Sequence, residues 1–158
     1  LPEGADPYDM ASYADFTLTD YSPELMFDKM TQFIAEHQDE PFFFYWATPI
    51  PHVPLQAPQR WVDHYVEKFG EEEPYLTERG YFPHRYPHAA YAAMVSYLDE
   101  QVGKLVAQLK EAGQYENTLI IFTSDNGPSF NGGTDSPWFE SGGPFAIERG
   151  AVIRGENN

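Results

Sequence analysis

The most informative stretch of the sequence is Thr118-Leu119-Ile120-Ile121-Phe122-Thr123-Ser124-Asp125-Asn126-Gly127-Pro128. It begins as a short, continuous apolar run, which is typical of a strand buried on both faces of a parallel sheet. The run stops at a turn in which Asp125 and Asn126 offer oxygen donors side by side. The sequence therefore predicts a buried strand that ends in polar side chains able to bind a ligand.

A second apolar run, Phe42-Phe43-Phe44-Tyr45-Trp46-Ala47, has the same character. It is too short for an independent helix and shows no polar alternation, so we predict another strand buried on both faces. The three prolines of residues 48–54 cannot continue the strand, because proline lacks a backbone donor and fixes the backbone angle. His52 is therefore expected on a stiff loop just past the strand.

Helical patterns surround the two runs. Ser22-Pro23-Glu24 predicts a helix start, with Ser22 as the cap, and the helix should end near Gln38. A short helix is expected near 61–69, and the clearest helix over 89–112. The predicted buried stripes are Met26, Met30, Phe33 and His37 in the first helix, and Val95, Leu98, Val102, Leu105, Val106 and Leu109 in the last. Helices that alternate with buried strands predict an α/β fold with a mostly parallel sheet.

Ligands of open α/β sheets bind beyond the carboxyl ends of the strands. If the two strands are parallel neighbours, His52, Asp125 and Asn126 converge on one edge. Carboxylate and amide oxygens suit Ca²⁺ or Mg²⁺, although two are too few for a complete site. A histidine there can bind an anion or act as a general acid. The residues alone favour a plain turn at 125–126 and a loop histidine packed beside aromatic side chains.

Two further patterns carry less weight. His84 and His88 have a spacing that binds metal on a helix, but the prolines that flank them disfavour a regular helix there. The run Glu71-Glu72-Glu73 has the pattern of a solvated acidic loop.

Composition excludes several classes of protein. The 158 residues hold 9 Lys and Arg against 25 Asp and Glu, a formal charge of −16, which argues against nucleic acid and anionic lipid as partners. The chain has no cysteine, so disulfides, thiolate zinc sites and a cysteine nucleophile are excluded within it. No apolar run is long enough to span a membrane.

Three blocks of the sequence resemble the sulfatase family. Residues 41–58 resemble its buried strand and Pro-His-x-Pro loop, residues 91–103 its long helix, and residues 117–128 its metal-binding strand end. The resemblance runs from about Ser22 to Pro144 and implies an alkaline-phosphatase-like α/β fold, with a mostly parallel central sheet flanked by helices. It also implies a sulfuric ester hydrolase that acts on a sulfated sugar, glycan or aryl compound, with a periplasmic or secreted parent.

The resemblance assigns roles to four residues. Asp125 and Asn126 would be ligands of Ca²⁺, with Mg²⁺ as the other hard cation to consider. His52 would contact the sulfate or its bridging oxygen and assist departure of the leaving group. Arg149, near the position of a family lysine, would contact the sulfate with its guanidinium group.

The chain also departs from the family pattern. The family nucleophile is a formylglycine made from Cys or Ser in a Cys/Ser-x-Pro-x-Arg motif, which these 158 residues lack together with two upstream acidic metal ligands. We therefore expect 1–158 to be a partial domain, the central portion of a sulfatase catalytic domain, with 61–88 as a substrate-side excursion. The chain alone is expected to be inactive and to self-associate through exposed sheet edges.

Other functions remain open at this point. A phosphatase, phosphonate hydrolase or phosphomutase of the same superfamily would more often carry Asp-His at 125–126, so Asn126 favours a sulfatase. A non-catalytic pseudoenzyme, or an acidic Ca²⁺-binding module that kept the scaffold, belongs to a different class of protein.

Overall fold

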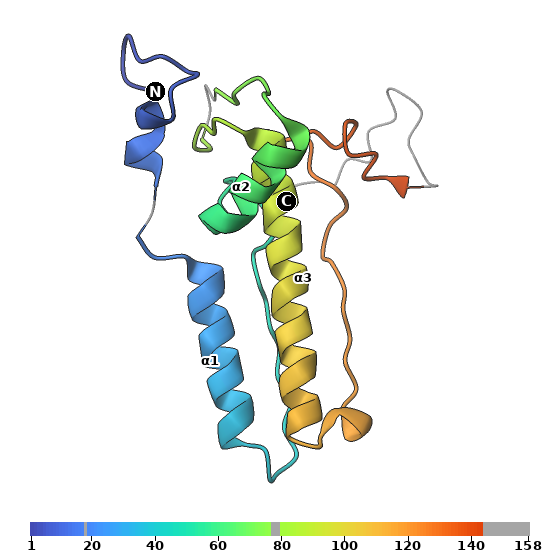
Figure 1. Ribbon diagram of the computed structural model, residues 1–158. Coiled ribbons are helices and arrows are strands. Elements are labelled where there is room, and N and C mark those ends of the chain that lie inside the picture. The colour runs from blue at the N-terminus through green and yellow to red at the C-terminus, as the bar shows by residue number, and fades with distance from the viewer. Residues whose placement is uncertain (18, 77–79, 144–158) are drawn as a thin grey trace.

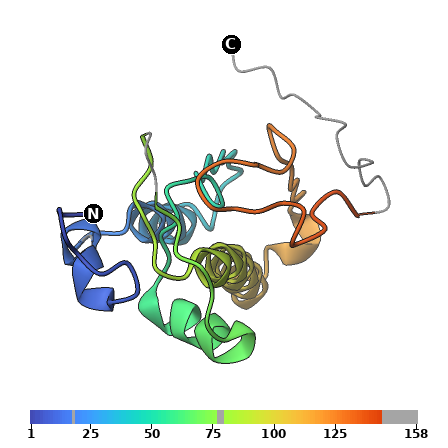
Figure 2. The same cartoon turned by 90° about the horizontal axis from the view of Figure 1, so that it is seen from above.

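The computed structural model describes residues 1–17, 19–76 and 80–143 (Figure 1). The long helix α3 is its axis, with α1 beside its lower half and α2 across its upper half; Figure 2 shows the same arrangement from above. None of the described helices is long and apolar enough to cross a membrane. The elements in chain order are η1 (Met10–Phe16), α1 (Ser22–Glu36), α2 (Gln59–Phe69), α3 (Pro87–Glu111) and η2 (Tyr115–Asn117).

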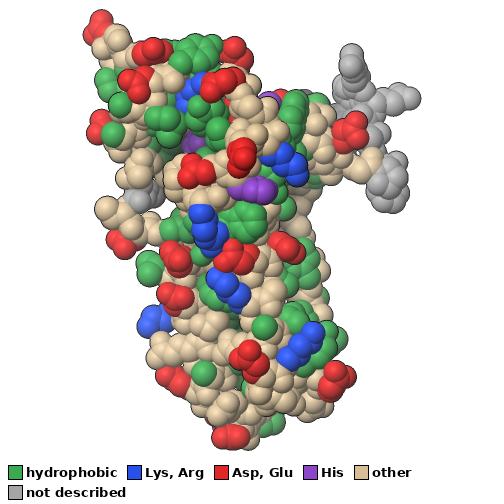
Figure 3. Space-filling view, in the orientation of Figure 1, with side chains coloured by type: hydrophobic (Ala, Val, Ile, Leu, Met, Phe, Trp, Pro, Cys, Tyr) green, Lys and Arg blue, Asp and Glu red, His purple; other side chains and the backbone are tan. Residues whose placement is uncertain are grey.

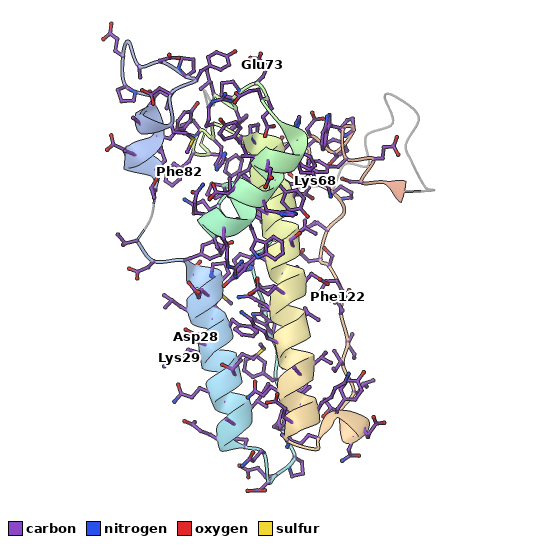
Figure 4. All side chains as sticks on the ribbon, viewed as in Figure 1. Asp28, Lys29, Lys68, Glu73, Phe82 and Phe122 are labelled. Atoms are coloured by element: carbon purple, nitrogen blue, oxygen red, sulfur yellow. The ribbon has the colours of Figure 1, made fainter. Side chains whose placement is uncertain are left out.

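Helix α1 forms where the sequence predicts it, with Pro23 and Glu24 in the first turn. Tyr21 rather than Ser22 occupies the cap position, and no side chain caps the helix. The predicted stripe is wrong in part, because the buried side chains of this helix are Pro23, Phe27, Met30 and Ile34. Both stripes fit a helical period, and only packing against α3 selects one of them. Asp28 and Lys29 lie on the side of α1 away from α3 (Figure 4).

Helix α3 begins at Pro87 and ends at Glu111, before Gly113 with its positive φ of 70°. Its first turns are rich in alanine, which lets neighbouring segments approach closely. The predicted stripe is again wrong in part, since Val95 is 45% exposed whereas Tyr97 and Gln101 are buried. Gln101 donates a hydrogen bond of 3.3 Å to the Pro23 carbonyl and so links α3 to α1.

Two hydrophobic clusters hold the described residues together. The upper one joins the proline loop to α3, and its buried members are Ile50, Val53, Leu55, Ala90, Met94 and Tyr97. The lower one joins α1 to the end of α3, and its buried members are Phe27, Met30, Ile34 and Leu109. The loop that carries His52 is therefore anchored in a core on both sides of that residue.

The two predicted strands are extended segments without strand partners among the described residues, where the only ladder contact is an isolated bridge between Tyr75 and His84. The expected α/β sheet is therefore not formed in this part of the chain. A strand exists only through hydrogen bonds to a neighbour, and the sequence pattern cannot supply that neighbour. Both segments still run in the same direction, opposite to α3 (Figure 1).

The expectation that these segments are buried on both faces is also wrong. Phe42 and Trp46 pack against the α1 aromatics Phe33 and Phe27, whereas Phe43 is 88% exposed. This alternation of two residues is the signature of a strand covered on one face. The other segment is more open still; Leu119, Ile121 and Phe122 are 84%, 77% and 73% exposed.

Replacing Met30 with alanine should lower the free energy of unfolding by about 2–5 kcal/mol, because Met30 is 1% exposed and lies between α1 and α3. Urea denaturation, monitored by the circular dichroism signal of the helices, measures this loss. Leu25→Ala on the same helix is the control, since Leu25 is 54% exposed and its removal should change stability by less than about 0.5 kcal/mol. Equal losses in both variants would contradict the packing of α1 on α3.

Candidate active site

His52 lies where the sequence predicts it, on the loop just past the first extended segment. Its side chain is exposed, and its ring meets that of Tyr81 edge to face at 6.3 Å. The ring nitrogen Nδ1 donates a hydrogen bond of 2.6 Å to the carbonyl oxygen of Val53. Because this bond uses Nδ1, Nε2 is the nitrogen left for a ligand.

Asp125 and Asn126 lie in a bend at the end of the second extended segment, and both are exposed. The hydroxyl of Ser124 donates a hydrogen bond of 2.8 Å to the Asn126 carbonyl and closes this bend. No hydrogen bond of either the Asp125 carboxylate or the Asn126 amide is recorded within the described part of the chain. Their oxygens are therefore available to a cation, but they lie in an open turn.

The chain after Asn126 returns to the His52 loop. Gly132 has a φ of +66° and lies so close to Val53 that a Cβ there would overlap the valine side chain. Its neighbour Gly133 lies against Tyr75 and Pro87 in the same way. The two loops thus meet at the upper end of α3 (Figures 1 and 2), although no direct contact of His52 with Asp125 or Asn126 is recorded for the described residues.

A complete metal centre is not present in the described residues, since no group of three or more His, Asp or Glu side chains there could hold an ion. Two oxygen donors fit the chemistry of a hard cation, but they cannot fill its coordination shell. Acidic side chains are scattered over the visible face with few basic ones among them (Figure 3). Arg149, the predicted sulfate contact, lies outside the described residues.

The acidic loop of residues 71–73 is not the solvated loop that the sequence predicts. Glu72 is not solvated; only 9% of its side chain is exposed. Its carboxylate accepts hydrogen bonds of 2.9 Å and 3.1 Å from the backbone N–H groups of His88 and Ala89, at the start of α3. Pro87 at the start of a helix was the signal that could have pointed to a nearby acidic cap.

Arg85 is a buried residue that sequence reasoning missed. It is 3% exposed and donates hydrogen bonds to the carbonyl oxygens of Tyr8 and Glu72, at 3.1 Å and 2.7 Å. Its guanidinium group also pairs with the carboxylate of Glu71. This one cation therefore ties the N-terminal segment and the acidic loop to the start of α3.

His84 and His88 lie in different settings, and His88 belongs to a regular helix although the flanking prolines predicted none there. His84 precedes α3, and its Nδ1 accepts a hydrogen bond of 3.0 Å from the backbone of Tyr86. Burial lowers the pKa of His84 from 6.5 to about 4. His88 lies inside the first turn of α3 and faces two carboxylates, from Glu72 and Asp135.

The described part of the chain is helical, with two extended segments that end at the residues of the candidate site. Residues 2–152 match the family model described as Sulfatase, so the chain belongs to the sulfatase family. This confirms the resemblance that the three blocks of sequence indicated. The structure accordingly holds part of the alkaline-phosphatase-like fold of that family.

Two curated relatives and one solved structure show how much of a whole protein this chain covers. Arylsulfatase J of Mus musculus is 34% identical over 78% of this chain and 19% of its own length. An N-acetylgalactosamine-6-O-sulfatase of Bacteroides thetaiotaomicron is 31% identical over 80% of this chain and 21% of its own length. The crystal structure of Ps i-CgsB in complex with k-i-k-neocarrahexaose aligns with a TM-score of 0.58 and 32% identity, over 75% of this chain and 23% of that one. The chain thus spans about a fifth of these proteins.

The buried histidine predicts a pH dependence of stability. Because the pKa of His84 is about 4 in the folded chain and 6.5 when unfolded, the unfolded chain binds more protons between these values. Stability should therefore be full above about pH 6.5 and fall as the pH is lowered toward about 4, by on the order of 2–3 kcal/mol. Urea midpoints measured across this range give the slope.

The control variant is His84→Asn, whose side-chain oxygen can still accept the bond from Tyr86 but does not titrate in this range. It should remove this part of the pH dependence. An unchanged slope in His84→Asn would contradict the assignment to His84.

Proposed function

We propose that residues 1–158 form the central portion of a sulfatase catalytic domain, and that the complete domain hydrolyses sulfate esters of a sugar or aryl compound. The observation that carries the proposal is the contact of Gly132 with Val53, because it brings the chain after Asp125 and Asn126 to the loop of His52. Family membership over residues 2–152 supports the reaction class.

His52 is the proposed catalytic residue of this portion. Cleavage of a sulfate ester builds negative charge on the bridging oxygen as its bond to sulfur breaks. A proton donor at that oxygen lowers the barrier. The Nδ1 proton of His52 is used in the 2.6 Å bond to the Val53 carbonyl, so Nε2 fills this role when the ring carries a second proton there. The anchored proline loop keeps the ring in place without a further hydrogen bond.

Asp125 and Asn126 are the proposed metal ligands. Their carboxylate and amide oxygens suit Ca²⁺, and Mg²⁺ takes the same donors. When bound, such a cation supplies Lewis-acid stabilisation of the sulfate charge. The remaining ligands and the formylglycine nucleophile would come from residues outside this chain, and Arg149 would add a contact to the sulfate.

The substrate class is proposed from the relatives. The matches include arylsulfatase J, an N-acetylgalactosamine sulfatase and a complex with a neocarrahexaose, so sulfate esters of both aryl compounds and glycans are proposed. Residues 61–88 are the proposed substrate-side excursion, because Tyr81 from this segment lies against His52 at 6.3 Å. A phosphatase or phosphonate hydrolase of the same superfamily, and a Ca²⁺-binding pseudoenzyme, are the competing functions.

The exposed apolar segments support the partial-domain proposal. Phe43 and Ile121 are 88% and 77% exposed, although a strand with such side chains is normally covered. We infer that further strands of the complete domain lie against these segments. In their absence, a second copy of the chain would cover the same surface.

The function is tested by extending the coding sequence upstream of Leu1 and assaying both chains on an aryl sulfate and a sulfated oligosaccharide with added Ca²⁺. The extended chain should carry a Cys/Ser-x-Pro-x-Arg motif and turn over sulfate esters, whereas residues 1–158 alone should not. In the extended chain, His52→Ala should lower kcat by about 10²–10⁴-fold.

His64→Ala is the matched control, since His64 is an exposed histidine on α2. Turnover of phosphate esters but not of sulfate esters would shift the assignment to a phosphatase. The absence of any nucleophile motif upstream would favour the pseudoenzyme. Turnover by residues 1–158 alone would overturn the expectation of inactivity.

Self-association of the 158-residue chain is a separate prediction. Light scattering should detect dimers or larger species, because the apolar segments of Phe43 and Ile121 are uncovered. The double variant Phe43→Ser/Ile121→Ser should shift the distribution toward the monomer. Met10→Ser is the control, because Met10 is also exposed, at 48%, but lies on η1. A monomeric parent chain would contradict this prediction.

A further inference from the structure

Two asparagines of this chain are followed by glycine, in the pairs Asn126-Gly127 and Asn131-Gly132. Asparagine is a chemically labile residue, and a following glycine makes it more so, because glycine has no side chain to block the approach of its own backbone nitrogen to the asparagine amide. The sequence alone gives the two pairs the same reactivity. The structure places them in different surroundings.

The reaction in question is a cyclisation followed by hydrolysis. The backbone nitrogen of the glycine loses its proton to a base in solution and attacks the side-chain Cγ of the asparagine. A new N–C bond forms, and the C–N bond of the amide breaks with release of ammonia. Water then opens the resulting succinimide ring to give aspartate or isoaspartate. Because the peptide unit is planar and moves as one piece, ring closure requires the whole peptide between the two residues to turn.

The peptide between Asn126 and Gly127 has room to turn. Both residues are exposed, at the bend that ends the second extended segment. A Cβ at Gly127 would meet nothing within 4 Å, so the space around this peptide is open. The Asn126 carbonyl accepts a hydrogen bond of 2.8 Å from the exposed hydroxyl of Ser124. Rotation exchanges this bond for one to water, which costs little.

The peptide between Asn131 and Gly132 is held in place. Its carbonyl accepts two hydrogen bonds from Thr134, one of 3.3 Å from the backbone N–H and one of 3.0 Å from the hydroxyl. Thr134 is fully buried. Gly132 is buried too, and with its φ of +66° it lies directly against the side chain of Val53. Rotation here breaks both bonds and moves Gly132 away from Val53.

Asn117 provides an internal reference. The residue after it is Thr118, whose branched side chain hinders the approach to the amide. The N–H of Thr118 also donates a hydrogen bond of 3.2 Å to the Tyr115 carbonyl. The nitrogen that would attack is therefore engaged, and Asn117 should be inert.

We propose that Asn126 is a site of spontaneous deamidation through attack of the Gly127 nitrogen, and that the fold protects Asn131 from the same reaction. The modification turns a neutral amide into a carboxylate beside Asp125, in a chain whose formal charge is already −16. In isoaspartate, the backbone also gains one methylene carbon. The effect on cation binding rests on the proposed function, which makes Asn126 a ligand, whereas the deamidation itself does not.

The first test uses the 158-residue chain without substitution, incubated in mildly alkaline oxygen-18-labelled water. Deamidation during the incubation then carries the heavy isotope, whereas deamidation during later digestion in ordinary water does not. Trypsin releases residues 111–149 as one peptide, because no Lys or Arg lies between Lys110 and Arg149. Fragment ions of this peptide report all three asparagines together. Asn126 should convert at least about tenfold faster than Asn131, whose peptide must first lose two hydrogen bonds.

The same incubation in concentrated guanidinium chloride is the control for sequence context. With the fold removed, Asn126 and Asn131 should convert at rates within about threefold of one another, since both precede glycine. Equal rates in the folded chain, or faster conversion of Asn131, would overturn the proposal. A preference for Asn126 that persists unchanged in the denaturant would also overturn it, because that preference would not come from the fold.

Two variants should move the two sites in opposite directions. Gly127→Ala adds a methyl group in open space and should slow the conversion of Asn126 about tenfold, because the methyl group hinders the attacking nitrogen. Thr134→Val keeps the shape of the buried side chain but removes its hydroxyl bond to the Asn131 carbonyl. It should speed the conversion of Asn131 about threefold to tenfold and leave Asn126 unchanged. Circular dichroism checks that each variant keeps its helices.

Unchanged rates in both variants would overturn the proposed mechanism and the proposed protection. None of these measurements involves turnover, so failure of the modification site and failure of the sulfatase proposal are distinguishable. If the extended chain hydrolyses sulfate esters while Asn126 of the 158-residue chain stays intact, only the modification site is lost. If Asn126 converts as expected and no sulfate ester is cleaved, only the proposed function is lost.

Discussion

The packing of the proline loop on the alanine-rich start of α3 is the contact on which the rest of the site depends. Ala89, Ala90 and Ala93 are fully buried, so this face of the helix offers little side-chain bulk. Val53 and Leu55 share the upper cluster with Ala90, and each buried aliphatic side chain of this size contributes about 1.5–3 kcal/mol. The exposed His52 therefore lies on backbone that is anchored by its neighbours. The same helix start carries His88, which contacts Asp135, and it lies against Gly133, so both loops of the candidate site pack on one helix.

The helices could be predicted from the sequence because their signals are local. Pro23 and Glu24 begin α1, and Gly113 follows α3, within a residue or two of the expected bounds. Which face each helix buries was less predictable, since Phe27 and Met26 are equally suited to a core. The sheet could not be predicted from local signals at all. The runs at 42–47 and 118–123 have strand composition, but a strand needs a partner that hydrogen-bonds along its length, and the described residues provide none.

The candidate site also has a part that local sequence signals predict and a part that they do not. The positions of His52, Asp125 and Asn126 beyond two extended segments follow from prolines and turn residues, which act locally. Glu72 could not be assigned from its neighbours, because a run of three glutamates has the same appearance whether it is solvated or caps a helix. Its role depends on the N–H groups of His88 and Ala89, which are brought to it by the fold. Buried carboxylates in a chain of charge −16 are tolerated where such donors replace water.

A chain that spans about a fifth of its relatives can keep the arrangement of its loops when the anchors of those loops lie within the chain. That condition holds for His52, whose neighbours are in the upper cluster, and for residues 129–139, which contact Val53 and Pro87 through two glycines. It does not hold for Asp125 and Asn126, because the segment before them is exposed and has no strand on either side among the described residues. The proton donor of the proposed reaction is therefore the part of the site that this chain organises by itself. Its metal ligands need the neighbouring strands of a sheet before they can be held at fixed distances.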